Sequence, residues 1–173
     1  ADAVTDSAGF ITVYPDGMEG TWSVGCDDCT HAEALKADDV TFLQPLTRHL
    51  AEELPLDTTS VFLAGFSQGG AMALHVGLRY PAQLAGIMAL SAYLLYPERL
   101  ENEHSPANAE TPVFIGHGTQ DPMVPFAFGQ SVAERLQNGK WPVEWHSYPI
   151  PHSVSQPEIV DIGRWLMHCF KQV

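Results

Sequence analysis

The residues Gly65-Phe66-Ser67-Gln68-Gly69 place a serine between two glycines, in the pattern G-x-S-x-G. This pattern is typical of a nucleophilic serine held on a strained turn between a β-strand and an α-helix. An uninterrupted apolar run, 60–64, precedes it, and a helix-like stretch, 68–79, follows it. We predict that the backbone of Ser67 is strained, at a cost of about 1 to 3 kcal/mol. We also predict that side chains in place of the two glycines would collide where strand and helix approach.

A serine hydroxyl attacks a carbonyl carbon only when a base takes its proton and a third group holds that base in the correct tautomer. In chains with this type of serine turn, the acid precedes the histidine. Asp121 follows a strand predicted to end near Ile115, and His152 follows one predicted to end near Tyr148. Both loops then lie at the carboxyl ends of parallel strands, the sheet edge that also carries Ser67. The sequence thus favours Ser67, Asp121 and His152 as nucleophile, acid and base.

Other acids and histidines are less well placed for this chemistry. Asp161 and His168 fall on the last predicted helix, away from this edge, and His117 comes one loop position too early. His75, on the helix after the serine, is interpreted as packing, and His104, among polar residues, as solvent-exposed.

Strands and helices alternate along the chain, and residues 15–36 are expected to form a loop. Apolar strands that alternate with helices predict an α/β fold, with a parallel sheet covered on both faces. The predicted strands are 10–14, 60–64, 84–90, 112–115 and 143–148, and the predicted helices are 38–53, 68–79, 126–136 and 156–170.

Length and composition restrict the function further. The chain has 173 residues, 45% of them hydrophobic, which is enough for one domain, 1–173, with a substantial core. Acidic residues outnumber Lys and Arg by 21 to 8, so the formal charge is −13. Nucleic acid and anionic lipid attract the opposite charge, so neither is expected as the primary partner. No apolar run reaches the roughly eighteen residues that span a bilayer.

Three segments carry a family resemblance: 63–74, 116–125 and 151–154. They resemble the motifs of the phospholipase/carboxylesterase family of α/β hydrolases, which includes acyl-protein thioesterases. Ser91-Ala92-Tyr93-Leu94 is similar to the Leu-Ser-Gly-Tyr-Leu stretch of that family, with Ala92 in place of the glycine. The resemblance covers about residues 60 to 170.

This resemblance implies an α/β-hydrolase fold, a mostly parallel sheet flanked by helices. It assigns Ser67 as nucleophile, Asp121 as orienting acid and His152 as base, and it implies that the backbone N–H of Gln68 contributes to the oxyanion hole.

The N-terminal part departs from that family. Residues 10–45, with Tyr14-Pro15-Asp16-Gly17 and Asp38-Asp39-Val40, resemble the related feruloyl-esterase and polyhydroxyalkanoate-depolymerase group. The His-Gly-x-Gly-type loop that donates the second oxyanion N–H in the family has no counterpart upstream of residue 10. We therefore expect a fold reduced at the N-terminus. Either the donor loop lies outside this chain, or the loop from Asp16 to Gly25 supplies the second N–H.

Two further groups of residues leave alternatives open. Three alternatives are open for Cys26 and Cys29: free loop thiols, a local disulfide, or half of a zinc site. No second Cys or His pair has the spacing that would complete a zinc site. Tyr93, Leu94 and Met123 are candidate substrate contacts, and the first two equally fit an ordinary core. Cys169, on the last predicted helix, is interpreted as buried packing.

The hypothesis is a serine carboxylic ester hydrolase that acts on small or short-chain acyl esters through an acyl-enzyme, without metal or organic cofactor. Two alternatives stay open: an acyl-thioester hydrolase, and a non-catalytic hydrolase-like domain that binds a ligand. The expected partner is a small-molecule ester. An exposed sheet edge would invite a homodimer. A cytoplasmic location is expected, with secretion as the alternative.

Overall fold

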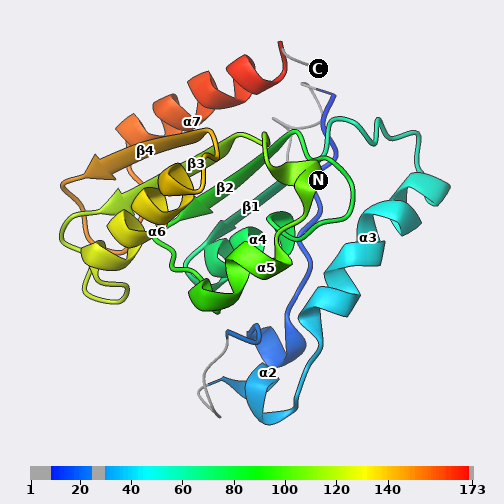
Figure 1. Ribbon diagram of the computed structural model, residues 1–173, viewed down its shortest axis with the longest axis horizontal. Helices are drawn as coiled ribbons and strands as arrows, with labels where there is room; N and C mark the ends of the chain where they lie inside the picture. Colours follow the sequence, from blue (N-terminus) through cyan, green and yellow to red (C-terminus); the bar gives the residue numbers. More distant parts are fainter. Residues whose placement is uncertain (1–8, 25–29, 172–173) are drawn as a thin grey trace.

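The structure, a computed structural model, describes residues 9–24 and 30–171 (Figure 1). Four parallel strands form one sheet in the order β1-β2-β3-β4. The strands are β1 (Phe62–Phe66), β2 (Gly86–Leu90), β3 (Val113–Gly118) and β4 (Val143–Tyr148). The helices are α2 (His31–Ala34), α3 (Asp39–Glu53), α4 (Gln68–Gly77), α5 (Leu100–Glu103), α6 (Phe126–Asn138) and α7 (Gln156–Cys169), with 3₁₀ turns η1 (Met18–Gly20), η2 (Pro97–Arg99) and η3 (Pro106–Asn108).

Successive strand residues point to opposite faces of the sheet. Because apolar residues occur on both faces, helices cover both. On one face, Ile87, Val113 and Ile115 join the buried cluster that α4 and α6 complete. On the other face, Phe114 packs with Trp165 of α7. Figure 1 shows α7 along one side of the sheet. The predicted parallel sheet between two helical layers is confirmed.

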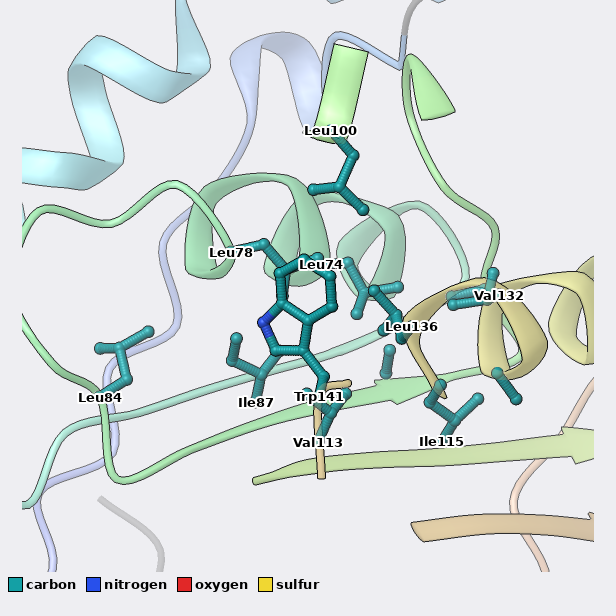
Figure 2. Close-up of a cluster of buried hydrophobic side chains, with 13 residues drawn as sticks. Leu74, Leu78, Leu84, Ile87, Leu100, Val113, Ile115, Val132, Leu136 and Trp141 are labelled. Atoms are coloured by element: carbon teal, nitrogen blue, oxygen red, sulfur yellow. The ribbon is translucent and has the colours of Figure 1, made fainter. Parts of the chain in front are cut away.

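The larger buried cluster lies between the sheet, α4 and α6. Figure 2 shows Trp141 in its middle, between Leu74 of α4, Leu78 just after that helix, and the strand residues beneath. Each large apolar side chain buried here stabilises the fold by about 1.5 to 3 kcal/mol. The indole Nε1–H of Trp141 donates to the carbonyl of Asn108 at 3.0 Å, so its polar atom is also satisfied.

From residue 38 onward, every predicted strand and helix is present with shifted boundaries, and α5, η2 and η3 are additional elements between β2 and β3. Asp38 caps α3, where its side chain accepts the N–H of Thr41 at 3.0 Å. β4 has the predicted bounds, and Cys169 is buried, as predicted. β3 is the main difference, because it extends to Gly118 rather than ending near Ile115.

The predicted strand over residues 10–14 is wrong. These residues form no ladder with β1, and Ile11, Val13 and Tyr14 are exposed. Phe10 instead packs on Phe170, with ring centroids 4.8 Å apart. β-branched and aromatic residues favour a strand only where a neighbouring strand supplies backbone partners.

Candidate functional site

The turn between β1 and α4 holds Ser67 in a left-handed conformation, with φ 56° and ψ −120°. A Cβ on Gly65 would lie 2.1 Å from the backbone carbon of Gly69, so only glycine fits there. A Cβ on Gly70 would lie 2.8 Å from the Cβ of Ala92. The predicted collision of a side chain at Gly69 is wrong, since a Cβ there would have no atom within 4 Å. The crowded positions are Gly65 and Gly70.

The start of α4 provides a backbone donor beside this serine. Gln68 is the first residue of the helix, and N–H groups in the first helical turn have no partner within the helix. The helix dipole also favours negative charge at this end. The N–H of Ser67 is already used, since it donates to the carbonyl of Leu90 at 2.8 Å. Gln68 is thus suited to bind an oxyanion.

Asp121 and His152, which lie far apart in the sequence, form a hydrogen-bonded pair. The Nδ1 of His152 lies 2.7 Å from Oδ2 of Asp121. Because a carboxylate only accepts, Nδ1 carries the proton and Nε2 is left to accept one. The other oxygen of Asp121 accepts the N–H groups of Met123 and Val124, both at 2.8 Å.

These contacts also keep Asp121 ionised. Burial alone would raise the pKa of its carboxyl, but the hydrogen bonds from His152, Val124 and Met123 outweigh burial and lower the pKa below its usual value. An ionised carboxylate beside Nδ1 stabilises the imidazolium that forms when Nε2 takes a proton.

The acid loop and the histidine loop are joined to each other by backbone hydrogen bonds. The N–H of Thr119 donates to the carbonyl of Tyr148 at 2.7 Å, and that of Gln120 donates to the carbonyl of Ile150 at 3.1 Å. A Cβ on Gly118 would lie 2.3 Å from the latter oxygen, so the two loops pack closely at that glycine. Asp121 and its partner are thus held by rigid strand ends.

The histidine loop closes on the start of α7. The hydroxyl of Ser155 accepts the N–H of Glu158 at 3.3 Å, and the Glu158 carboxylate accepts the N–H of Ser155 at 3.2 Å. Glu158 is only 2% exposed, and burial raises the pKa of its carboxyl. This capping box fixes the chain three residues after His152.

Phe66 brings the base to the serine turn. Its ring centroid lies 4.5 Å from that of His152, and Ser67 is the next residue in the chain. No hydrogen bond between Ser67 and His152 is present among the described residues. Such bonds are often long without substrate and tighten when it binds. No role for Phe66 could be predicted from the sequence, because the position before the serine is variable in the motif.

The three candidate substrate contacts lie in different surroundings. Tyr93 is half-buried against the cluster of Val24 and Met72, and burial raises the pKa of its phenol. Leu94 packs against the larger cluster. Met123 is 72% exposed and lies in the acid loop. Their contact with substrate stays a prediction.

The acids and histidines that were less well placed than Asp121 and His152 have other surroundings. Asp161 accepts the hydroxyl of Tyr148 at 3.0 Å and pairs with Arg164 on α7. His117 belongs to strand β3 rather than to the loop, and it is fully buried. The expectation that His104 is solvent-exposed is wrong, because its half-buried ring packs edge-on against Trp141 at 5.3 Å.

Several N–H groups of the N-terminal loop are already occupied. Those of Gly20 and Thr21 donate to carbonyls of η1 and its N-cap, and that of Ser23 donates to Asp39 at 2.6 Å. Gly25, with the alternatives for Cys26 and Cys29, lies outside the described residues. Within the ranges that the structure describes, no three His, Cys, Asp or Glu side chains form a candidate metal site.

Comparison with known proteins now identifies the family. The sequence model described as Phospholipase/Carboxylesterase matches residues 26–170. The chain belongs to this family. Acyl-protein thioesterase 1 of Debaryomyces hansenii is 36% identical over 132 residues, and a probable carboxylesterase of Oryza sativa subsp. japonica is 32% identical over 127 residues. These matches cover 75% and 73% of this chain, and 57% and 47% of the two relatives. The chain thus spans about half the length of these relatives.

Solved structures confirm the α/β-hydrolase fold. The crystal structure of Arabidopsis thaliana SOBER1 superposes with a TM-score of 0.71 at 28% identity, covering 82% of this chain and 66% of that one. The resemblance of residues 10–45 to feruloyl esterases and depolymerases is not borne out, because the family match begins at residue 26 and the relatives are thioesterases and carboxylesterases. In the described ranges, no helix is long and apolar enough to cross a membrane.

Proposed function

We propose that this chain hydrolyses acyl esters by covalent catalysis, with Ser67 as nucleophile, His152 as base and Asp121 as orienting acid. The observation that carries the proposal is the 2.7 Å hydrogen bond between His152 Nδ1 and Asp121. This bond leaves Nε2 as a proton acceptor, on a ring that packs against the residue preceding a strained serine.

The reaction follows from these positions. Nε2 of His152 takes the hydroxyl proton of Ser67 while the Oγ of Ser67 attacks the ester carbonyl carbon. The N–H of Gln68 binds the oxyanion that develops. The tetrahedral intermediate then expels the alcohol, which leaves with the proton from His152. A water molecule, deprotonated by the same nitrogen, attacks the acyl-enzyme and releases the acid and the free serine.

The proposed substrates are small or short-chain acyl esters. Phe66 and Met123 present exposed apolar surface beside the base and the acid, suited to a short acyl chain. Acyl thioesters are a second candidate because they pass through the same tetrahedral intermediate. The sequence identity with the acyl-protein thioesterase 1 of Debaryomyces hansenii favours thioesters as substrates.

A fluorophosphonate probe tests the proposed function, because it labels only a serine that a base activates. We expect one adduct, located at Ser67 by peptide mass spectrometry, and none in Ser67→Ala. The matched control is Ser131→Ala, which removes an exposed serine of α6 and is expected to label normally. Absence of labelling would contradict the proposal and favour a non-catalytic binding domain, and an adduct elsewhere would contradict the assignment of Ser67. Parallel assays with an acetyl ester and an acetyl thioester distinguish the two substrate classes.

A further inference from the structure

His117 is a fully buried polar side chain at the end of β3 that the proposed reaction does not use. Its ring lies between α6 and β4, with centroids 6.0 Å from Phe126 and 6.5 Å from Trp145. On α6, a Cβ on Gly129 would lie 2.1 Å from His117 Nδ1. Two aromatic rings and one glycine therefore enclose part of the imidazole.

A hydrogen bond determines which ring nitrogen of His117 carries the proton. Nε2 of His117 lies 2.9 Å from the carbonyl oxygen of Val124. Because a carbonyl oxygen only accepts, Nε2 carries the proton. Nδ1 is buried and has no hydrogen-bond partner among the described residues. The contacts are thus those of a neutral imidazole that donates from Nε2.

The same nitrogen faces the proposed acid. His117 Nε2 lies 3.6 Å from Oδ2 of Asp121, the oxygen that binds His152. Val124, whose carbonyl accepts from His117, donates its own N–H to the other oxygen of Asp121 at 2.8 Å. One N–H of His117 therefore bonds to the loop that holds the acid, and the positive end of its dipole also lies near the acid itself.

We infer that His117 is a positioning residue for Asp121, an inference that rests on the proposed function. Packing alone does not account for an imidazole at this place. An apolar side chain of similar volume would fill the space without burying an unpartnered Nδ1, which is costly. The donor to Val124 is what an apolar side chain would lack. Without it, the loop that directs Asp121 toward His152 is less firmly fixed.

Three variants test this role by kinetics. His117→Leu removes the donor, His117→Gln keeps an amide donor, and Gly129→Ala pushes the ring from α6. The matched control for the last is Gly163→Ala on α7, where an added Cβ meets no atom within 4 Å. Rates are expressed per active site, counted by titration with the fluorophosphonate probe.

We expect His117→Leu to lower kcat about tenfold to a hundredfold, the cost of a small misplacement near the chemistry, while KM changes little. The acid limb of kcat/KM moves to lower pH, because a displaced carboxylate stabilises the protonated base less. His117→Gln is expected to recover part of the lost kcat and part of the original acid limb. Gly129→Ala is expected to lower kcat and shift the acid limb as His117→Leu does, and Gly163→Ala is expected to change neither. If His117→Leu keeps the original kcat and acid limb, the inference is wrong.

Nuclear magnetic resonance of ¹⁵N-histidine-labelled protein gives a readout that needs no turnover. We expect His117 to be protonated on Nε2 and bare on Nδ1, and the downfield His152 Nδ1–H signal to weaken in His117→Leu and return in His117→Gln. A proton on His117 Nδ1, or an unchanged His152 signal, overturns the inference even if Ser67 proves inactive. Failure of the proposed function shows separately, as wild-type protein that the probe does not label.

Discussion

Ser67 has a backbone conformation that a non-glycine residue adopts only at a cost of about 1 to 3 kcal/mol. Three contacts hold it there: its N–H bonds to Leu90, its carbonyl accepts from Ala71, and Gly65 allows strand and helix to meet. Five other non-glycine residues in the described ranges also have a positive φ, so the strain supports the assignment only together with the position of Ser67 between β1 and α4. The conformation and position of Ser67 together support its proposed role as nucleophile.

The first prediction concerns the acid and the base. Asp121→Asn is expected to lower kcat/KM for an activated ester by up to about 10⁴-fold, because the amide favours the wrong tautomer of His152. His152→Ala is expected to be at least as severe, since no base remains for Ser67. Asp161→Asn is the matched control, because its carboxylate bonds to Tyr148 and Arg164 instead. An inactive Asp161 variant beside an active Asp121 variant would reverse the assignment.

A second prediction separates the two glycines of the motif. Gly65→Ala is expected to lower the free energy of unfolding by at least about 1 to 3 kcal/mol, because the new methyl group overlaps the backbone of Gly69. Gly69→Ala is expected to be neutral or to stabilise α4 by up to about 1 kcal/mol, as alanine does in a helix. Urea unfolding measures both. Equal losses would show that the turn is not crowded as the structure has it.

At the scale of elements, the order of strands and helices from residue 38 could be predicted, because their apolar periodicity reflects burial that the sheet and its helices supply. The segment 10–14 could not. Its residues have strand propensity, but no neighbouring strand pairs with them in the described sheet. The extension of β3 was also missed, because Gly116 and Gly118 interrupt its apolar run.

The candidate site was predictable only as far as chain order determines it. The serine turn, the loop after β3 and the loop after β4 placed Ser67, Asp121 and His152 at one sheet edge, and the structure joins the last two. The contacts of Phe66 and His117 depend on how loops fold over each other, which no local pattern records.

The third prediction concerns α4 and its dependence on pH. Burial first, and the positive charge of Arg79 second, lower the pKa of His75 from 6.5 to about 4. Between these values the unfolded chain binds a proton that the folded chain does not, so stability falls as the pH drops from 6.5 toward about 4. In His75→Gln, the midpoint of urea unfolding should vary less over this range.

His49→Gln, at an exposed position of α3, is the control for that experiment and should keep the original pH dependence. If His75→Gln retains the full pH dependence, other groups are responsible for it.

At the scale of the whole molecule, the sheet brings three loops to one edge, and the oxyanion donors decide how fast the site works. The described residues offer the N–H of Gln68, whereas those of Gly20, Thr21 and Ser23 are already bonded within the N-terminal region. Loss of one of two donors costs about 2.7 to 4 kcal/mol, or about a hundredfold to a thousandfold in rate.

The fourth prediction takes Gln68 as the one donor, following the alternative in which the second donor loop lies outside this chain. The 173-residue chain is expected to hydrolyse p-nitrophenyl acetate slowly and unactivated ethyl acetate below detection, because only a good leaving group compensates for a weak oxyanion hole. A kcat/KM for ethyl acetate within the usual enzyme range, about 10⁴ to 10⁸ M⁻¹s⁻¹, would show that a second donor converges with Gln68.

The most direct test of the proposed covalent mechanism is the hydrolysis of p-nitrophenyl acetate by Ser67→Ala. We expect the alanine to keep the fold, which an unchanged unfolding midpoint would verify, and to remove the only atom that forms the proposed acyl-enzyme. We expect the wild-type chain to acquire one acetyl group, at Ser67, during turnover. We expect the variant to lose several orders of magnitude in kcat/KM and to remain unacetylated. Near-full activity of Ser67→Ala, with contaminating esterase excluded, would contradict it.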